Sequence, residues 1–570
     1  MTIQFSLPSE LSGAVDLAVA EWTSKNKVAR FWQKDPTLWT SDGEEKWLGW
    51  IDIVERQQAN LAAYAALAAD VKSAGFKSVL LLGMGGSSLC PEVLSVTFGQ
   101  QNGFPALHIV DSTDPVQIKA TQDKVNLAET LVVVASKSGS TLEPNVLKQY
   151  FFEEMKKAVG AEKAGSHFLA ITDPGSKMEQ VAKADGFRHI FYGDPTIGGR
   201  FSALSPFGVV AATVAGLDVN KLLAEAAKAV ASAKQEPAAN PAVELGLLMG
   251  VAANGGRDKI TIFTSPEIYD LGAWMEQLIA ESTGKLGKGI TPVDRERIAE
   301  PAVYDNDRVF ASIRYAGTAD KAADQALAAK VAAIEAAGHP VVHVEIADLY
   351  EIFGQFFTWE IATSVAGSEM GINPFNQPDV ESAKIETRAL TAAYEQTGKL
   401  AERVPVLEDA GIKVYATAEY AATLGKQQGL TGLLKAHLGQ IHAGDYFATL
   451  AYLPMFAEHE AVIQGFRHKV RDAKKVATCL GFGPRFLHST GQDYKGGPNS
   501  GVFLQITADH AIDLAIPGQK LSFGVVIDAQ AAGDLAVLES RGRRALRVHL
   551  GADVKAGLKK LAAAVDAALQ

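Results

Sequence analysis

Short apolar runs alternate with helical patterns along most of the chain. Five of these runs, between about residues 77 and 195, are rich in β-branched and aromatic residues, and each closes in glycine, serine, aspartate or proline. Continuous apolar strands separated by helices predict a parallel sheet covered on both faces, which binds ligands beyond the carboxyl ends of its strands. The runs are KSVLLLGMGGSS, LHIVDST, LVVVASKSGST, HFLAITDPGS and HIFYGDP.

The same pattern recurs further along the chain. The first 75 residues carry apolar positions at helical spacing and end at Gly75, which predicts a helical segment. After the first series come the predicted strands KITIFTS, RVFASIRY and PVVHVEI. A polar break, EQTGKLAERVPVLED, then leads to a third region, where GDYFATLAYLPMFAEHEAVIQGFRHKV reads as helical and SGVFLQIT, SFGVVIDA and RALRVHL read as strands. We therefore predict an α/β protein with a helical segment (1–75), two doubly wound parallel-sheet domains (76–235 and 236–390) and a C-terminal α/β extension (391–570).

Composition narrows the class of protein. A chain of 570 residues is too long for one core, and 47% hydrophobic with 21% charged residues is typical of a globular enzyme. The net charge of −11 argues against nucleic-acid and anionic-membrane partners but allows a local basic pocket for a small anion. Two cysteines, no secretory pattern at the N-terminus and no apolar run long enough to span a bilayer predict a cytoplasmic protein.

Two loops suit a phosphate group. The first predicted strand runs into Gly83, Gly85, Gly86, Ser87 and Ser88, where backbone amides and hydroxyls can hold an anion at a helix start. A plain tight turn explains the same residues, and the spacing matches neither a nucleoside-triphosphate loop nor a dinucleotide fingerprint.

The second loop is SKSGSTLEPN. It places four hydroxyls, those of Ser136, Ser138, Ser140 and Thr141, within six residues just before a predicted helix. Hydroxyls and free amides at a helix N-terminus satisfy phosphate oxygens without a large positive charge. A serine-rich helix cap is the alternative.

Three further segments carry candidate catalytic groups. In GGRFSALSPFG, Arg200 lies between glycines and serines and can stabilise a developing oxyanion. In EQLIAESTGKLGKG, Gln277 and Glu281 share one helical face, so Glu281 can act as a general base. In NPFNQPDVESAK, Gln377 and Lys384 lie seven residues apart, a spacing that brings them to one side. Taken singly, each segment is also compatible with a solvated surface residue.

In order along the chain, these segments resemble the glucose-6-phosphate isomerase family, which is built from two sugar-isomerase (SIS) domains. GMGGSSL is similar to its first glycine loop, SKSGSTLE to its phosphate loop and GGRFSALSPFG to its arginine signature. EQLIAESTGK is similar to the segment of its base and FNQPDVESAK to its glutamine-lysine signature. Five motifs in the family's order cover about residues 80–385 and make chance agreement implausible.

The resemblance implies a role for each candidate and no metal or redox cofactor. Arg200 would stabilise the enediol oxyanion, Glu281 would move a proton between C2 and C1, and Lys384 would act near the ring oxygen. The implied substrate-binding residues are Gly86, Ser87, Ser136, Lys137, Ser138, Thr141, Glu143, Gly199, Gln277 and Gln377. Another SIS phosphosugar isomerase, for mannose or aminosugar phosphates, and a non-catalytic sugar-phosphate-binding regulator remain alternatives.

The family also uses a histidine to open the sugar ring, four residues before a glutamine. In the usual interval the chain offers only His339 and His343, in a predicted buried strand, whereas LHSTGQ supplies His488 and Gln492 with the right spacing. The family's dimers take this loop from the neighbouring subunit. We expect the C-terminal extension to present His488 to its own chain, in a monomer or a homodimer. The arrangement is similar to the isomerase part of fused transaldolase/glucose-6-phosphate isomerase proteins, but no barrel precedes residue 75.

Overall fold

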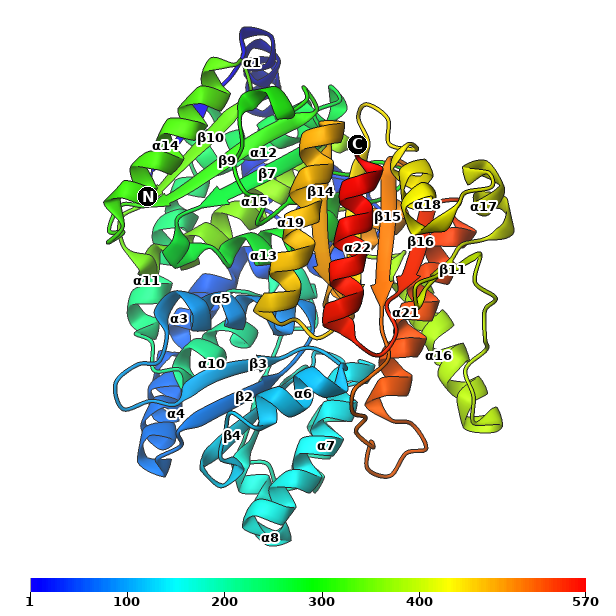
Figure 1. The fold of residues 1–570 in the computed structure, drawn as a ribbon. Helices are drawn as coiled ribbons and strands as arrows, with labels where there is room; N and C mark the ends of the chain where they lie inside the picture. The colour runs from blue at the N-terminus through cyan, green and yellow to red at the C-terminus, as the bar shows by residue number, and fades with distance from the viewer. Residues whose placement is uncertain (1) are drawn as a thin grey trace.

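The computed structural model describes residues 2–570, apart from the side chains of residues 380 and 381. Three sheets form an α/β architecture, which confirms the predicted fold class. Figure 1 shows the first sheet in the lower half, the second above it, and the C-terminal sheet against both. No helix in residues 2–570 has both the length and the apolar character that a bilayer crossing requires.

The first sheet is fully parallel, with strand order β3-β2-β4-β5-β6. Along β2, Leu80 and Leu82 face the buried side of α7, whereas Val79 and Leu81 pack on the opposite face with α5 and α10. All four side chains are fully buried, as continuous apolar strands predict. The strands are β2 (Ser78–Leu82), β3 (Ala106–Val110), β4 (Thr130–Ala135), β5 (Phe168–Thr172) and β6 (His189–Tyr192).

The second sheet has the order β1-β10-β9-β7-β8 and shares a continuous core with the first. At one edge of this sheet, residues 2–6 form a strand that pairs antiparallel with β10. The helical segment predicted for the start of the chain is therefore wrong over these residues. A five-residue strand before the first helical period is too short to show a clear alternation. The strands are β1 (Thr2–Ser6), β7 (Lys259–Thr264), β8 (Thr291–Val293), β9 (Arg308–Tyr315) and β10 (Val341–Ile346).

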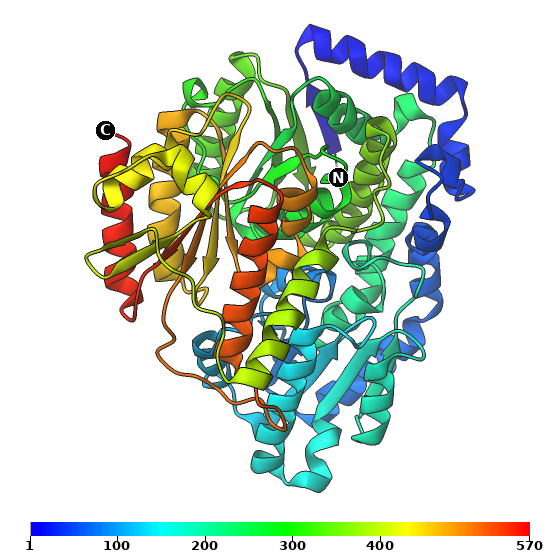
Figure 2. The same ribbon diagram turned by 90° about the vertical axis from the view of Figure 1, so that its right-hand side faces the viewer.

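The C-terminal sheet has the order β11-β12-β16-β15-β13-β14 and a core of its own. Its four parallel strands run in the order second, first, third, fourth, as the parallel strands of the other two sheets do. Helices α18, α19 and α22 cover one face, and α21 covers the face toward the rest of the chain (Figure 2). The strands are β11 (Leu407–Asp409), β12 (Ile412–Tyr415), β13 (Tyr446–Tyr452), β14 (Ala477–Phe482), β15 (Gly501–Thr507) and β16 (Arg544–His549).

Two predicted elements of this C-terminal region are wrong. SFGVVIDA begins α21, whose N-cap is Ser522, and GDYFATLAYLPMF contains strand β13 before Pro454 precedes α19. Short apolar runs do not separate a strand from a buried helix, and the proline was the available sign that one helix could not span the segment.

Helices account for most of the remaining ordered structure. Those that precede strand β7 are α1 (Ser9–Ser24), α2 (Lys27–Trp32), α3 (Ile53–Ala59), α4 (Leu61–Ala74), α5 (Leu89–Phe98), α6 (Pro115–Gln122), α7 (Leu142–Val159), α8 (Ala161–Ala164), α9 (Lys177–Ala184), α10 (Pro206–Val214), α11 (Val219–Ala233) and α12 (Pro241–Asn254). The others are α13 (Leu271–Thr283), α14 (Lys321–Ala336), α15 (Ile352–Met370), α16 (Val380–Thr397), α17 (Ala418–Leu424), α18 (Gly429–Leu438), α19 (Ala457–Lys474), α20 (Gly491–Gly496), α21 (Phe523–Ser540) and α22 (Val554–Ala568). Short 3-10 turns that carry site residues are η3 (Gly85–Ser87), η6 (Gly199–Phe201) and η11 (Arg485–His488).

Candidate active site

A cavity of about 390 Å³ brings together most of the predicted site residues. Arg200 and Glu143 do not line it but contact residues that do. Ser140, in the phosphate loop, faces a smaller adjoining cavity of about 190 Å³. The predicted residues that line the main cavity are Gly86, Ser87, Ser136, Lys137, Ser138, Thr141, Gly199, Gln277, Glu281, Gln377, Lys384 and His488.

One end of the cavity has the features of an anion site. The 18-residue helix α7 begins at Leu142, and its N-cap, Thr141, makes no capping hydrogen bond with its side chain, so first-turn amides and the hydroxyl are available to a ligand. The buried hydroxyl of Ser136 also has no hydrogen-bond partner among the described residues. Lys137 is paired with Asp173 at 2.5 Å, so the amides and hydroxyls would supply most of the contacts.

The side chain of Arg200 is 1% exposed, and hydrogen bonds fix its guanidinium in place. Its guanidinium donates to the hydroxyl of Ser282 at 2.7 Å and to the backbone oxygens of Pro374 and Asn376 at 2.6 and 2.9 Å. A terminal nitrogen lies 3.6 Å from a carboxylate oxygen of Glu281. Burial lowers the pKa of Arg200, and Glu281 opposes that shift. The arginine is thus a fixed positive charge beside the candidate base.

Gln277 and Glu281 occupy one face of α13, as their spacing predicts. The Gln277 amide donates to Glu281 Oε2 at 3.0 Å, and both side chains are buried. Gln277 Oε1 has no partner among the described residues. Glu281 therefore has one oxygen held by an amide and the other facing a guanidinium, an arrangement that fixes its orientation.

His488 reaches the same cavity from η11, after strand β14. Its Nε2 lies 2.9 Å from Glu143 Oε1, while Nδ1 makes no hydrogen bond with the described residues. Burial acts to raise the pKa of Glu143, but the charge and hydrogen bond of His488 outweigh it and lower that pKa. His339 and His343 lie elsewhere: His339 packs between Tyr304 and Phe310, and His343 contacts Glu335.

The segment around His488 is buried, although its residues are mostly polar. Gln492 donates to the Gly284 carbonyl at 2.8 Å and to Asp379 at 2.6 Å, and it accepts the Asp379 amide at 3.0 Å. Gly284 follows the helix of Glu281, and Asp379 lies between Gln377 and Lys384. One glutamine thus joins the histidine, base and lysine segments.

Comparison with known proteins identifies the family. A family model described as phosphoglucose isomerase matches residues 63–296. A glucose-6-phosphate isomerase of Rubrobacter xylanophilus is 30% identical over 380 residues, which cover 59% of this chain and 87% of the relative. The chain belongs to the phosphoglucose isomerase family. A probable glucose-6-phosphate isomerase of Methanococcus maripaludis is 28% identical over 372 residues, which cover 59% of this chain and 82% of that protein.

Solved structures support the same fold. A hypothetical protein from Thermus thermophilus aligns with a TM-score of 0.59 at 23% identity and covers 68% of this chain and 100% of its own. A glucose-6-phosphate isomerase from Chlamydia trachomatis aligns with a TM-score of 0.50 at 20% identity, over 58% of this chain and 73% of its own.

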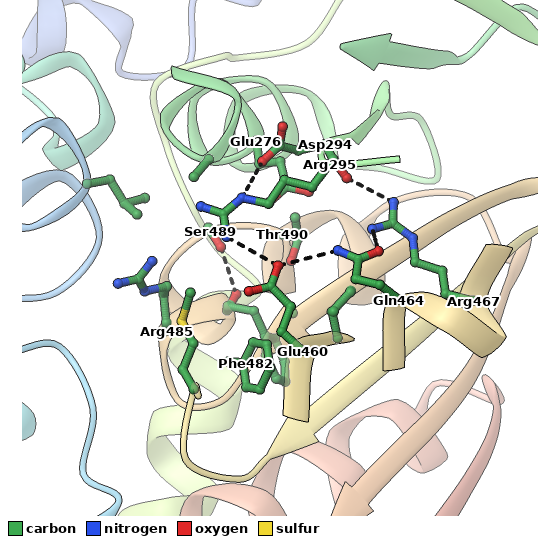
Figure 3. A pocket seen from close by; sticks show the side chains of 16 residues that line it. Glu276, Asp294, Arg295, Glu460, Gln464, Arg467, Phe482, Arg485, Ser489 and Thr490 are labelled. Atoms are coloured by element: carbon green, nitrogen blue, oxygen red, sulfur yellow. Dashed lines mark hydrogen bonds and ion pairs between the residues drawn. The ribbon is translucent and has the colours of Figure 1, made fainter. Parts of the chain in front are cut away.

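The match to the family model ends at residue 296, so His488 lies outside the matched segment. Figure 3 shows how the C-terminal region is held: charged side chains surround a small cavity of about 50 Å³ behind η11. Arg467 donates to the Asp294 carbonyl at 2.9 Å, Arg485 pairs with Glu92 at 2.6 Å, and Arg295 lies 3.4 Å from Glu460. Buried and partly buried polar contacts of this kind fix the position of the C-terminal region.

One contact at the site was not foreseen. Gln530 of α21 donates to Glu143 at 2.7 Å. The sequence does not predict this contact, because the segment before Gln530 has the pattern of a strand and the two residues are nearly 400 positions apart. In residues 2–570, no cluster of three or more histidine, cysteine, aspartate or glutamate side chains is arranged to ligate a metal.

Proposed function

We propose that the chain interconverts glucose 6-phosphate and fructose 6-phosphate through a cis-enediol, in glycolysis and gluconeogenesis. The observation that carries this proposal is one cavity lined by a phosphate-type loop, a buried glutamate and a histidine, with a buried arginine 3.6 Å from that glutamate. Family membership and the relatives named glucose-6-phosphate isomerase support the same activity.

The phosphate group would lie at the start of α7. Ser87, Ser136, Ser138 and Thr141 offer hydroxyls there, and the helix N-terminus favours negative charge. Gly86 and Gly199 allow the backbone to approach the ligand closely. The other end of the sugar would then extend toward Glu281 and His488.

Ring opening requires a proton to leave the C1 hydroxyl and another to reach the ring oxygen. His488 would exchange these protons, with its free Nδ1 toward the ligand and Nε2 held by Glu143. Lys384 and Gln377, which line the same cavity, would assist at the ring oxygen.

Isomerisation of the open chain moves one proton between neighbouring carbons. Glu281 would take the proton from C2 and return it to C1, while Gln277 holds its carboxylate. Arg200 would stabilise the negative charge that develops on the enediol oxygens, at little cost in reorganisation because its guanidinium is already fixed. All the proposed proton transfers use side chains of this chain.

We also propose that residues 391–570 form a separate unit which presents His488 to the site of its own chain, and that the protein acts in the cytoplasm. The separate C-terminal core and the buried, unpaired Cys90 and Cys479 support these proposals.

Replacing the base tests the proposed reaction. Glu281→Gln keeps the shape of the side chain but removes the proton acceptor, so kcat for fructose 6-phosphate formation should fall about 10²- to 10⁴-fold. The control is Glu276→Gln, on the same helix but facing the cavity behind η11. Turnover by Glu281→Gln close to that of the control would refute the role of Glu281. Mannose 6-phosphate, assayed in parallel, tests which C2 epimer is preferred.

A further inference from the structure

A chain of hydrogen bonds leads from the C-terminal helix α21 to the proposed ring-opening histidine. Thr113 donates its hydroxyl to Gln530 Oε1 at 2.6 Å, and Gln530 Nε2 donates to Glu143 Oε1 at 2.7 Å. The same oxygen of Glu143 faces His488 Nε2 at 2.9 Å. All but His488 are at least 96% buried.

The orientation of the Gln530 amide follows from its two neighbours. A hydroxyl can donate to the amide oxygen, whereas the carboxylate of Glu143 can only accept while it is ionised. The reversed amide would place an oxygen against that carboxylate and leave its NH₂ toward Thr113. The Glu143 carboxylate therefore fixes the NH₂ end of Gln530 toward itself, and the Thr113 hydroxyl donates to the amide oxygen at the other end.

Glu143 needs this second side-chain donor. A buried carboxylate is costly unless hydrogen bonds replace its hydration, and Glu143 receives them from His488, from Gln530 and from its own backbone amide. With both side chains in place the carboxylate stays charged and fixes the orientation of the His488 ring.

We propose that Gln530 is a positioning residue for ring opening: it holds Glu143, which in turn orients His488 toward the sugar. The inference rests on the proposed isomerase function and extends it to a helix that lies beyond the matched family region. Gln530 touches no substrate in this scheme and acts only through Glu143.

Several charged or titratable groups surround this chain of contacts. Lys384 and Arg388 of α16 line the adjoining cavity with Glu143 and His488, and Lys384 helps to lower the pKa of Glu143. At the end of β13, Tyr452 lies close enough for Glu143 to help to raise its pKa, although burial is the main cause. On α21, Asp534 is paired with Lys495 at 2.6 Å. Lys384 and His488 favour an ionised Glu143.

Two substitutions distinguish positioning from simple packing. Gln530→Leu removes the donor at every pH, and kcat should fall about 10- to 100-fold, as expected for a hydrogen bond to a charged group. Gln530→Glu keeps the shape, and its carboxyl can donate to Glu143 only while protonated. Its activity should therefore exceed that of Gln530→Leu at acidic pH and fall toward it as the pH rises.

The matched control is Gln519→Leu. Gln519 also reaches from the C-terminal region to α7, where it donates to Gln149 at 2.6 Å, but it touches neither Glu143 nor His488. Gln519→Leu should keep the wild-type pH profile of kcat. Thermal unfolding of each variant, recorded at each assay pH, separates loss of activity from loss of folded protein.

Ring opening can be followed by itself, because opening and closing the ring interconverts the α and β anomers of glucose 6-phosphate. Exchange spectroscopy by NMR should show slower interconversion with Gln530→Leu but not with Glu281→Gln, which lacks only the base. Unchanged anomer exchange and an unchanged pH profile in both Gln530 variants would overturn the inference. A wild-type protein without isomerase activity would instead overturn the proposed function.

Discussion

The glycine loop and the arginine loop touch at Gly86, and this contact supports a quantitative prediction. A Cβ added at Gly86 would lie 1.8 Å from the Gly199 carbonyl oxygen and 3.1 Å from the Arg200 amide nitrogen. These neighbours are backbone atoms, so no flexible side chain can move away. Gly86→Ala must therefore separate η3 from η6.

The size of the effect follows from this clash. Relief of a 1.8 Å contact requires the two loops to part by more than about 1 Å. Arg200 moves with η6, while its hydrogen bonds to Ser282 and Pro374 resist the movement. Displacement of a catalytic group by about 1 Å can cost about 10²-fold in rate, so we expect kcat/KM to fall about 100-fold. Overpacking should also lower the stability by about 1–3 kcal/mol.

Steady-state kinetics with glucose 6-phosphate, together with urea unfolding, test this prediction. Gly198→Ala is the control, because the nearest atom to its added Cβ is the Phe375 carbonyl oxygen at 3.9 Å. A Gly86→Ala protein that is folded and has kcat/KM within threefold of wild type would refute the argument that close contact of these loops places Arg200.

Three further predictions concern the C-terminal region and the segments that it contacts. Arg467→Met removes the donor to Asp294 and should destabilise the protein by roughly 1–3 kcal/mol in urea unfolding, with loss of activity as η11 loosens. Burial, and then the charge of Asp294, raise the pKa of Glu276 from 4.5 to about 8. Between these pH values the folded state holds a proton that the unfolded state releases, so the free energy of unfolding should fall as the pH rises. Glu276→Gln should flatten this dependence in unfolding measured from pH 5 to 9. Mixing Arg200→Ala with His488→Ala protein should restore no activity, because the proposed site takes both residues from one chain.

Each of these predictions has an outcome that would contradict it. Lys469→Met, at an exposed position of the same helix α19, is the control for Arg467→Met, and equal stability of the two variants would exclude an anchoring role. If the pH dependence of the free energy of unfolding is unchanged in Glu276→Gln, another group must bind the proton, and the prediction is wrong. Activity recovered on mixing, with subunit exchange shown independently, would mean that the histidine crosses between chains.

The sequence predicted all five strands of the first sheet and three of the five strands of the second, and it picked out residues that line one cavity, for identifiable reasons. Strands such as β4 are uniformly buried and end in polar turns, and Glu281 lies four residues after Gln277 on a regular helix. Such features are local, so the pattern of side chains suffices to find them. The strand β1 and the helix α21 were missed because pairing and burial, which depend on distant residues, decide their structure.

The histidine segment shows the same limit at the site. The spacing of His488 and Gln492 marked a candidate, but the residue types around them are those of a polar loop. In the structure Gln492 is buried because its amide bonds to Gly284 and Asp379, which come from two other segments. Polar residues are predicted to be exposed until their partners are known, and Gly284 and Asp379 are both more than 100 positions away from Gln492.

The delivery of His488 by the same chain that carries Glu281 has a consequence for how activity depends on protein concentration. A site completed by a second subunit is lost on dilution, since its population follows mass action. A covalently connected segment instead meets its site at a fixed effective concentration, whatever the amount of enzyme in solution. The histidine segment is moreover buried against α13 and the Asp379 turn. Turnover per molecule should therefore stay constant as the enzyme is diluted into the range where a dimer would dissociate.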